Sequence, residues 1–296
     1  MSSEIDYFLR QLINGLSVGS MYAMIAVGYS MVYSILYLIN FAHGDLYIFG
    51  TFLALALFNL GLPLIGAMVL GAILCAMIAM GIERMIYRPV RTANRIVPMV
   101  GALGAALVLR TIAQVFWGAS QVHYPSLIAN KPIFLGASLQ INSQNVLILC
   151  IGAICVIGLT LVIKFTKVGK ATQCVMQSIT TSSLMGIRTD VIIPLVYALG
   201  GFLGAIGGVL MCSYYTVINI EMGLWGTCKA WAASQLGGVG SLYGAFVGGI
   251  ILGVAESLAA AYINSAYKDA VGYIIIVVVL LVRPEGLFGK KKAVKA

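Results

Sequence analysis

Four polar side chains lie within long apolar segments, where an ionisable or hydrogen-bonding group is unusual. Asn40, His43 and Asp45 fall within LINFAHGDLYIFG at residues 38–50, and Glu256 lies in an apolar run nearer the C-terminus. Such groups can bind a proton, a metal cation or a polar solute. At membrane depth they are energetically costly and usually face a cavity or a charged partner, so they are candidates for lining a translocation path.

Two interpretations of the 38–50 segment are open. Gly44 permits a break in the backbone, and unwound backbone at membrane depth is tolerated where it lines a cavity or is buried in protein. Alternatively, the segment is an ordinary turn between two spans. In that case Asn40 and Asp45 are helix caps and His43 is a turn residue.

The sequence predicts no catalytic centre. The six cysteines are scattered through apolar segments without a C-x-x-C motif or a Cys/His cluster, so neither a metal site nor a disulfide framework is expected. GLFGKK at residues 286–291 lacks the spacing of a phosphate-binding loop. We therefore expect a chain that is not an enzyme and binds no cofactor itself.

Composition indicates a membrane protein. The 296 residues are 61% hydrophobic and only 9% charged, whereas about a quarter of the residues in a soluble domain are charged. The net charge of +9 is then explained by basic membrane loops, and no nucleic-acid partner is expected. We predict an all-α, polytopic fold and a single transmembrane domain over residues 1–296.

About eight to nine membrane helices are predicted, because a spanning helix needs roughly 20 apolar residues. The first apolar stretch, residues 11–42, is too long for one simple span, so it either continues past the membrane or breaks near Gly28. The predicted spans are 11–38, 43–60, 63–82, 96–117, 144–163, 191–212, 225–240, 242–262 and 267–283.

Basic residues predict the orientation. Thirteen of the 18 lysines and arginines form three clusters, at residues 84–95, 164–188 and 283–295. Loops rich in Lys and Arg remain in the cytoplasm, and the number of spans between the clusters agrees with this. The C-terminus is therefore expected in the cytoplasm of a cell with the chain in its inner membrane, and the 118–143 loop on the outer side.

The loop at residues 164–190 is expected to form a short amphipathic helix. Val168, Ala171, Val175 and Ile179 recur at helical spacing within a polar run. Such a helix docks on lipid headgroups or on a soluble partner. Three lysines at its start are fewer than the four to eight basic residues of a typical lipid-binding cluster, which favours a protein partner.

Glycines at intervals of four are predicted to pack helices closely, because small residues allow helix backbones to approach in lipid. A flexible pivot is the rival interpretation. The glycines concerned are Gly200, Gly204, Gly208, Gly240, Gly244 and Gly248.

The chain resembles branched-chain amino-acid ABC permeases, most closely the smaller of the two paired permeases. The resemblance covers almost the whole chain in order. It is carried by the run at 15–50, RPVR at 88–91, GKA at 169–171, LMGIRTD at 184–190, and the stretches from YYTVIN at 214 to YKD at 269 and VRPEGLFG at 282–289.

This resemblance implies an ABC importer permease fold and a set of partners. These are a second homologous permease, two ABC ATPases that hold ATP and Mg²⁺, and a periplasmic or lipid-anchored substrate-binding protein. The 164–190 segment would be the cytoplasmic coupling helix that docks on the ATPase. The matching coupling positions are Gly169, Lys170, Ala171, Gln173, Gln177, Leu184, Gly186 and Ile187.

The sequence departs from the family pattern in the middle of this helix. Gln173 stands where arginine is usual, and Gln177 and Ser178 stand where carboxylates are common. We therefore expect docking mainly through small and apolar residues.

The resulting prediction is a permease subunit of an ATP-driven importer of leucine, isoleucine and valine. Three alternatives remain open at this point. The first is a urea or short-amide importer of the same family. The second is an ion-coupled secondary carrier that uses His43, Asp45 and Glu256, and the third is a passive channel.

Overall fold

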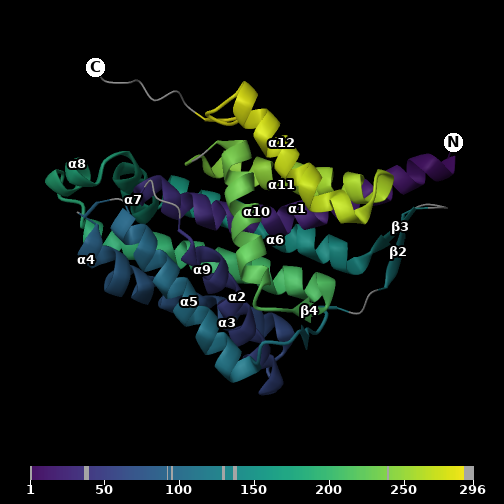
Figure 1. Ribbon diagram of the computed structural model, residues 1–296, viewed down its shortest axis with the longest axis horizontal. Helices are drawn as coiled ribbons and strands as arrows, with labels where there is room; N and C mark the ends of the chain where they lie inside the picture. The colour runs from purple at the N-terminus through teal and green to yellow at the C-terminus, as the bar shows by residue number, and fades with distance from the viewer. Residues whose placement is uncertain are drawn as a thin grey trace.

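The computed structural model describes residues 2–36, 40–91, 93–94, 96–128, 131–135, 139–238 and 240–289. Most of them are helical, and the long helices α1, α6 and α9 run roughly along the longest axis of the molecule, whereas α5 and α12 are inclined to it (Figure 1). The helices are α1 Ser2–Leu36, α2 Ala42–Asn59, α3 Leu64–Ile82, α4 Arg88–Val90, α5 Ile96–Trp117, α6 Ser143–Phe165, α7 Lys167–Gln177, α8 Ile179–Leu184, α9 Thr189–Tyr215, α10 Met222–Gly237, α11 Leu242–Tyr262 and α12 Lys268–Val282.

Short irregular elements complete the chain. A π-helical turn, Glu83–Tyr87, continues α3 into α4, and a 3₁₀ turn, Ser265–Tyr267, precedes α12. Strand β1 (Val122–His123) pairs antiparallel with β4 (Val217–Ile218), and β2 (Pro132–Leu135) pairs antiparallel with β3 (Leu139–Asn142). These four strands are the extended segments among the described residues, and they leave the expectation of an all-α membrane fold intact.

Seven helical segments in the described residues are long and apolar enough to cross a membrane. They match seven of the nine predicted spans. The other two, predicted at 43–60 and 225–240, form α2 and α10, of 18 and 16 residues. Both are buried over much of their length. The nine predicted segments are therefore all helical, but two of them are shorter elements packed inside the bundle.

Residues 11–36 of the first apolar stretch lie in one continuous helix, so the predicted alternative of a break near Gly28 is wrong. The 35 residues of α1 span about 52 Å at 1.5 Å per residue, which exceeds a hydrocarbon core of about 30 Å. Gly28 lies inside α1 because it is a packing position: a Cβ atom there would lie 2.7 Å from the carbonyl oxygen of Gly200 in α9.

Helices α1 and α9 form the centre of the bundle. Both are largely buried, whereas α6 and α12 leave most of their surface exposed. Helix α1 packs against α11 and α9, and α9 also packs against α3 and α2. Since lipid provides no hydrophobic drive for helix association, this arrangement depends on close backbone contact. A Cβ atom on Gly19 of α1, for example, would lie 2.8 Å from the Cα atom of Ile250 in α11.

The bundle has two distinct ends (Figure 1). One end, here called the basic end, carries α4, α7 and α8 and with them two of the basic clusters. The opposite end, here called the hairpin end, carries the β2–β3 hairpin and the N-terminus of α1. The grouping of Arg88, Arg91 and Arg188 at one end agrees with the predicted sidedness of these loops.

Candidate functional site

Asn40 and His43 anchor the beginning of α2 inside the bundle. Asn40 Oδ1 accepts hydrogen bonds from the Ala42 backbone amide at 3.1 Å and from the Tyr87 hydroxyl at 2.8 Å. The Nε2 atom of His43 donates to the carbonyl oxygen of Ile25 in α1 at 3.2 Å. Both side chains are buried, so their polar groups are used to attach α2 to its neighbours. Asn40 thus has the local contact expected of a cap residue.

Asp45 forms an ion pair with Arg110 of α5. The guanidinium donates from Nε to Oδ1 at 3.0 Å and from Nη2 to Oδ2 at 3.2 Å. Asp45 is buried, whereas 29% of the Arg110 side chain is exposed. Sequence reasoning identified Asp45 as a candidate but not its partner Arg110. The available signal was that a single cation in an apolar span requires a counter-charge at similar depth.

Arg110 belongs to an exposed stripe on α5 that also contains uncharged polar residues. Leu103, Leu107 and Gln114 lie on the same helical face as Arg110, and Thr111 lies beside it. Their side chains are exposed, whereas that of Arg110 is partly buried. An arginine and a glutamine in the middle and outer part of a spanning helix are poorly compatible with lipid. This face of α5 is therefore suited to contact protein or water.

Glu256 belongs to a different ion-pair cluster. It is fully buried in α11, pairs with Lys229 of α10, and accepts a hydrogen bond from the Tyr22 hydroxyl at 3.0 Å. Lys229 also contacts Asp269 of α12 at 2.8 Å. The two carboxylates are thus balanced by two lysines, because Lys268 also lies 4.0 Å from Glu256. Within the described residues, no group of three or more His, Cys, Asp or Glu side chains could hold a metal ion.

The 164–190 segment forms two helices rather than the single helix that was expected. Ser178 is extended, with φ −163° and ψ 117°, and separates α7 from α8. Hydroxyl groups cap both helices: Thr166 Oγ1 accepts from the Gly169 amide at 3.0 Å, and Ser178 Oγ accepts from the Thr181 amide at 3.2 Å. Ser178 therefore ends one helix and begins the next.

The buried face of α7 differs from the predicted apolar stripe. Gly169, Thr172 and Val175 are buried, whereas Val168 is exposed and Ile179 lies beyond the break on α8. Gly169 is needed for packing because a Cβ atom there would overlap the Ile163 and Val162 backbone of α6. Helix α7 is therefore held against the bundle by Gly169 and Thr172 as well as by apolar residues, since Val175 is buried and Ala171 packs against the core.

The remaining predicted coupling positions differ in how exposed their side chains are. Lys170, Gln173 and Gln177 are exposed on α7, and Ala171 and Ile187 are partly buried. At the end of α8, Leu184 and Met185 are 83% and 79% exposed. Gly186 follows with a φ of +81°, a left-handed conformation that favours glycine. The tip of α8 thus presents two large apolar side chains away from the bundle.

An arginine network connects two sequence motifs that are far apart in the chain. Arg88 and Arg91 of RPVR contact Asp190, at 3.0 and 3.4 Å, and Asp190 ends the LMGIRTD motif. Arg91 also pairs with Glu83, which is fully buried in the π-helical turn. The network fixes the start of α9, and with it the end of the α7–α8 segment, to the end of α3.

The predicted packing glycines occupy several environments. Gly200 faces Gly28, Gly204 and Gly208 face Tyr47 of α2, and Gly248 faces Ala233 of α10. Gly244 packs against Gly237 at the end of α10. Gly240 differs, because it has a φ of +84° in the turn before α11 and is therefore not part of a helix contact.

Comparison with known proteins places this arrangement among permeases. Residues 11–280 match the family described as "Branched-chain amino acid transport system / permease component". LivH of Salmonella typhimurium, a high-affinity branched-chain amino acid transport system permease protein, is 37% identical over a 308-residue alignment that covers 100% of both chains. BraD of Pseudomonas aeruginosa, which has the same description, is 37% identical over 304 residues and 99% of both chains.

A solved structure has a similar fold. A chain in PsaBC from Streptococcus pneumoniae in complex with Fab superposes with a TM-score of 0.52, covering 96% of this chain and 97% of that chain, at 14% identity. At this identity the likeness concerns the fold alone. It is consistent with the all-α, polytopic architecture described above.

Proposed function

The chain belongs to the family of branched-chain amino acid transport permeases, and from this premise we propose that it carries leucine, isoleucine and valine across the membrane. It is a multi-pass membrane protein and a transport subunit rather than an enzyme. The names of its full-length relatives favour this substrate class over urea or a short amide. We treat its 296 residues as a single permease domain.

The translocation path is proposed to run along the exposed stripe of α5 beside Asp45. The observation that supports this is the partly exposed Arg110 guanidinium in a membrane-spanning helix, because such a group needs protein or water rather than lipid. The partly exposed Arg110 guanidinium would bind the carboxylate of an amino acid, and the buried Asp45 would hold Arg110 in place. Asn40 and His43 would act by holding α2 in place, and Glu256 by holding α10, α11 and α12 together.

Coupling to ATP hydrolysis is proposed to occur through α7 and α8. A pair of ABC ATPases, which bind the ATP and Mg²⁺, would dock on this surface. The exposed Leu184 and Met185 support an apolar contact, and Lys170, Gln173 and Gln177 supply its polar edge. Gly169 and Gly186 would shape the segment rather than touch the ATPase. Motion of this surface would reach α9 directly, because α9 begins at Thr189.

We also propose an assembly and a location that suit this arrangement. The basic end and the C-terminus would lie in the cytoplasm, and the chain would lie in the inner membrane. A second homologous permease would cover the exposed face of α5. A periplasmic or lipid-anchored binding protein would deliver the amino acid to the hairpin end.

Reconstitution tests the proposed function. Proteoliposomes containing the permease with its second permease and ATPases should accumulate radiolabelled leucine only with internal ATP and external binding protein. A protonophore should not reduce this uptake. Uptake driven by a proton gradient without ATP would instead identify an ion-coupled carrier, and equilibration without either energy source would identify a channel. Accumulation of urea in preference to leucine would identify the amide importer.

A further inference from the structure

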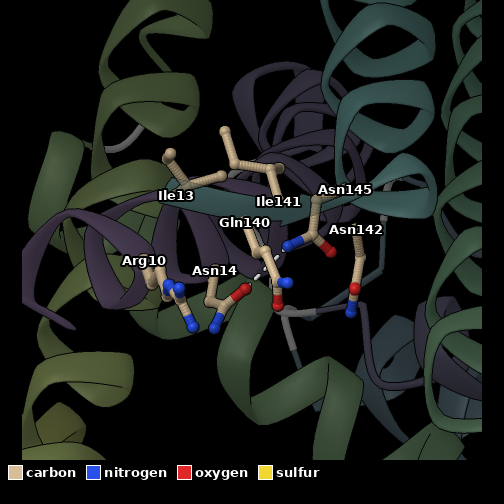
Figure 2. Close-up of a pocket in the computed structure, with 7 residues that line it drawn as sticks. All are labelled: Arg10, Ile13, Asn14, Gln140, Ile141, Asn142 and Asn145. Carbon is tan, nitrogen blue, oxygen red and sulfur yellow. Dashed lines mark hydrogen bonds between the residues drawn. The ribbon is translucent and has the colours of Figure 1, made fainter. Parts of the chain in front are cut away.

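A polar cavity lies at the hairpin end, between α1, β3 and the beginning of α6. Its volume is about 190 Å³. Figure 2 shows the side chains of Asn14 and Gln140 between Arg10 on one side and Asn145 and Asn142 on the other. The lining residues are Arg10, Ile13, Asn14, Gln140, Ile141, Asn142 and Asn145.

Among the residues that the structure describes, the lining carries one positive charge, that of Arg10, and no negative charge. Four of the other six described residues in the lining are amides. The acidic residues of the same helix segment, Glu4 and Asp6, precede Arg10 and do not line the cavity. A guanidinium surrounded by amide N–H donors favours a carboxylate or another small anion.

Asn145 adds an acceptor to this cavity. Its side chain is 2% exposed, and its Nδ2 atom donates to Asn14 Oδ1 at 2.6 Å. Its Oδ1 atom is buried without a hydrogen-bond partner in the part of the chain that the structure describes. Buried polar atoms are normally hydrogen-bonded, so an ammonium group that reaches this oxygen would donate the hydrogen bond that it lacks.

We propose that this cavity is a second binding site for the transported solute, a zwitterionic α-amino acid with an apolar side chain. The proposal rests on the proposed function for its substrate class. The carboxylate would bind Arg10 and neighbouring amide N–H groups, and the ammonium would bind Asn145 Oδ1. Ile13 and Ile141, which also line the cavity, would contact the aliphatic side chain.

The position of the cavity suits an entry site. Asn142 precedes α6 and Asn145 lies in its first turn, so the cavity lies at the membrane boundary on the hairpin end. It is separate from the Asp45–Arg110 pair, which joins α2 to α5. An amino acid released at this end would be held at the membrane surface before it reaches the path along α5.

Binding to the assembled transporter tests the proposal. The complex without its binding protein is placed in nanodiscs of phosphatidylcholine and phosphatidylglycerol, and equilibrium binding of radiolabelled leucine is measured. Arg10→Gln should weaken binding about tenfold and Gln140→Ala, at an exposed position, about threefold. Lys131→Gln is the matched control, because Lys131 is an exposed cation at the same end outside the cavity, and it should bind leucine like the parent.

Each other outcome overturns the cavity site. Equal binding by the parent, Arg10→Gln and Gln140→Ala would place the leucine elsewhere, and loss of binding only in Arg110→Met would place it in the path. Loss of leucine binding on addition of phosphatidylethanolamine, whose headgroup carries the same two charges, would identify a lipid site. Normal ATP-driven leucine uptake alongside any of these results would reject the cavity site while retaining the proposed function.

Discussion

The Arg110 guanidinium holds the Asp45 carboxylate through two hydrogen bonds, from Nε to Oδ1 at 3.0 Å and from Nη2 to Oδ2 at 3.2 Å. Bidentate pairs of this kind fix orientation as well as distance. Asp45 lies in the first turn of α2, whereas Arg110 lies within the spanning helix α5. The pair therefore joins the start of a short internal helix to a helix that has an exposed face.

Removing one member of this pair should destabilise the fold more than removing both. Asp45→Asn leaves the Arg110 charge uncompensated, and Arg110→Met does the same to Asp45. We expect each single substitution to lower the free energy of unfolding by about 2–3 kcal/mol, because breaking a buried pair strands a charge. The double variant should lose less than either, which thermal unfolding of the purified complex can measure. Additive losses in the double variant would contradict this.

The helices were predictable because a helix that spans the hydrocarbon core must be apolar over about 20 residues. Each predicted span is helical, including the segments that became α2 and α10. Their contacts were not predictable from these rules. Arg110 and Asp45 are 65 residues apart, and Lys229 and Glu256 are 27 apart. An apolar run contains no information about which face of one helix meets which face of another.

The coupling segment contains a second feature that could not be predicted from the sequence. Its polar character and location were clear from the sequence, but the break at Ser178 was not. Serine is a good N-cap, and a cap requires the chain to leave the helical conformation. In a run of Gln, Ser and Thr several residues could fill this role. The apolar period that normally marks a helix was too weak to locate the end of α7.

Arg91 should be more important to the basic end than its neighbour Arg88. Arg91 neutralises the buried Glu83, whereas Arg88 is 48% exposed and, among the described residues, pairs with the exposed Asp190 alone. Arg91→Gln should lower the free energy of unfolding by about 3 kcal/mol, and Arg88→Gln by less than about 1 kcal/mol. Paired thermal-unfolding measurements would test this. Equal losses would indicate that Arg91 does not compensate Glu83.

The tip of α8 should affect coupling without affecting folding. Leu184→Asp and Met185→Asp place a charge on side chains that are almost fully exposed, so the unfolding temperature should change little. If an apolar ATPase surface covers them, leucine-stimulated ATP hydrolysis should fall at least tenfold. Thr180→Asp, at an exposed position on the same helix, is the matched control. It should retain more leucine-stimulated ATP hydrolysis than either tip variant. Full coupling in both tip variants would exclude this contact.

Two glycine substitutions should change stability in opposite directions. Gly28→Ala places a Cβ atom 2.7 Å from the Gly200 carbonyl oxygen, so α1 and α9 must separate. Overpacking of this kind costs about 1–3 kcal/mol. Gly158→Ala in α6 meets no atom within 4 Å and should be neutral or stabilising, by up to about 1 kcal/mol, since alanine favours the helix. The unfolding temperatures of the two purified variants measure the difference, and a stable Gly28→Ala variant would argue against the close α1–α9 contact.

Glu256 should prove structural rather than a proton carrier. It is fully buried and neutralises Lys229, which contacts the half-exposed Asp269 as well. Glu256→Gln should therefore lower the free energy of unfolding by about 2–3 kcal/mol, and Asp269→Asn by less than about 1 kcal/mol, because its charge is partly solvated. The residual leucine uptake of the Glu256→Gln transporter should still require ATP and resist a protonophore. If the parent shows uptake driven by a proton gradient and the well-folded Glu256→Gln variant does not, Glu256 would instead be the proton site of an ion-coupled carrier.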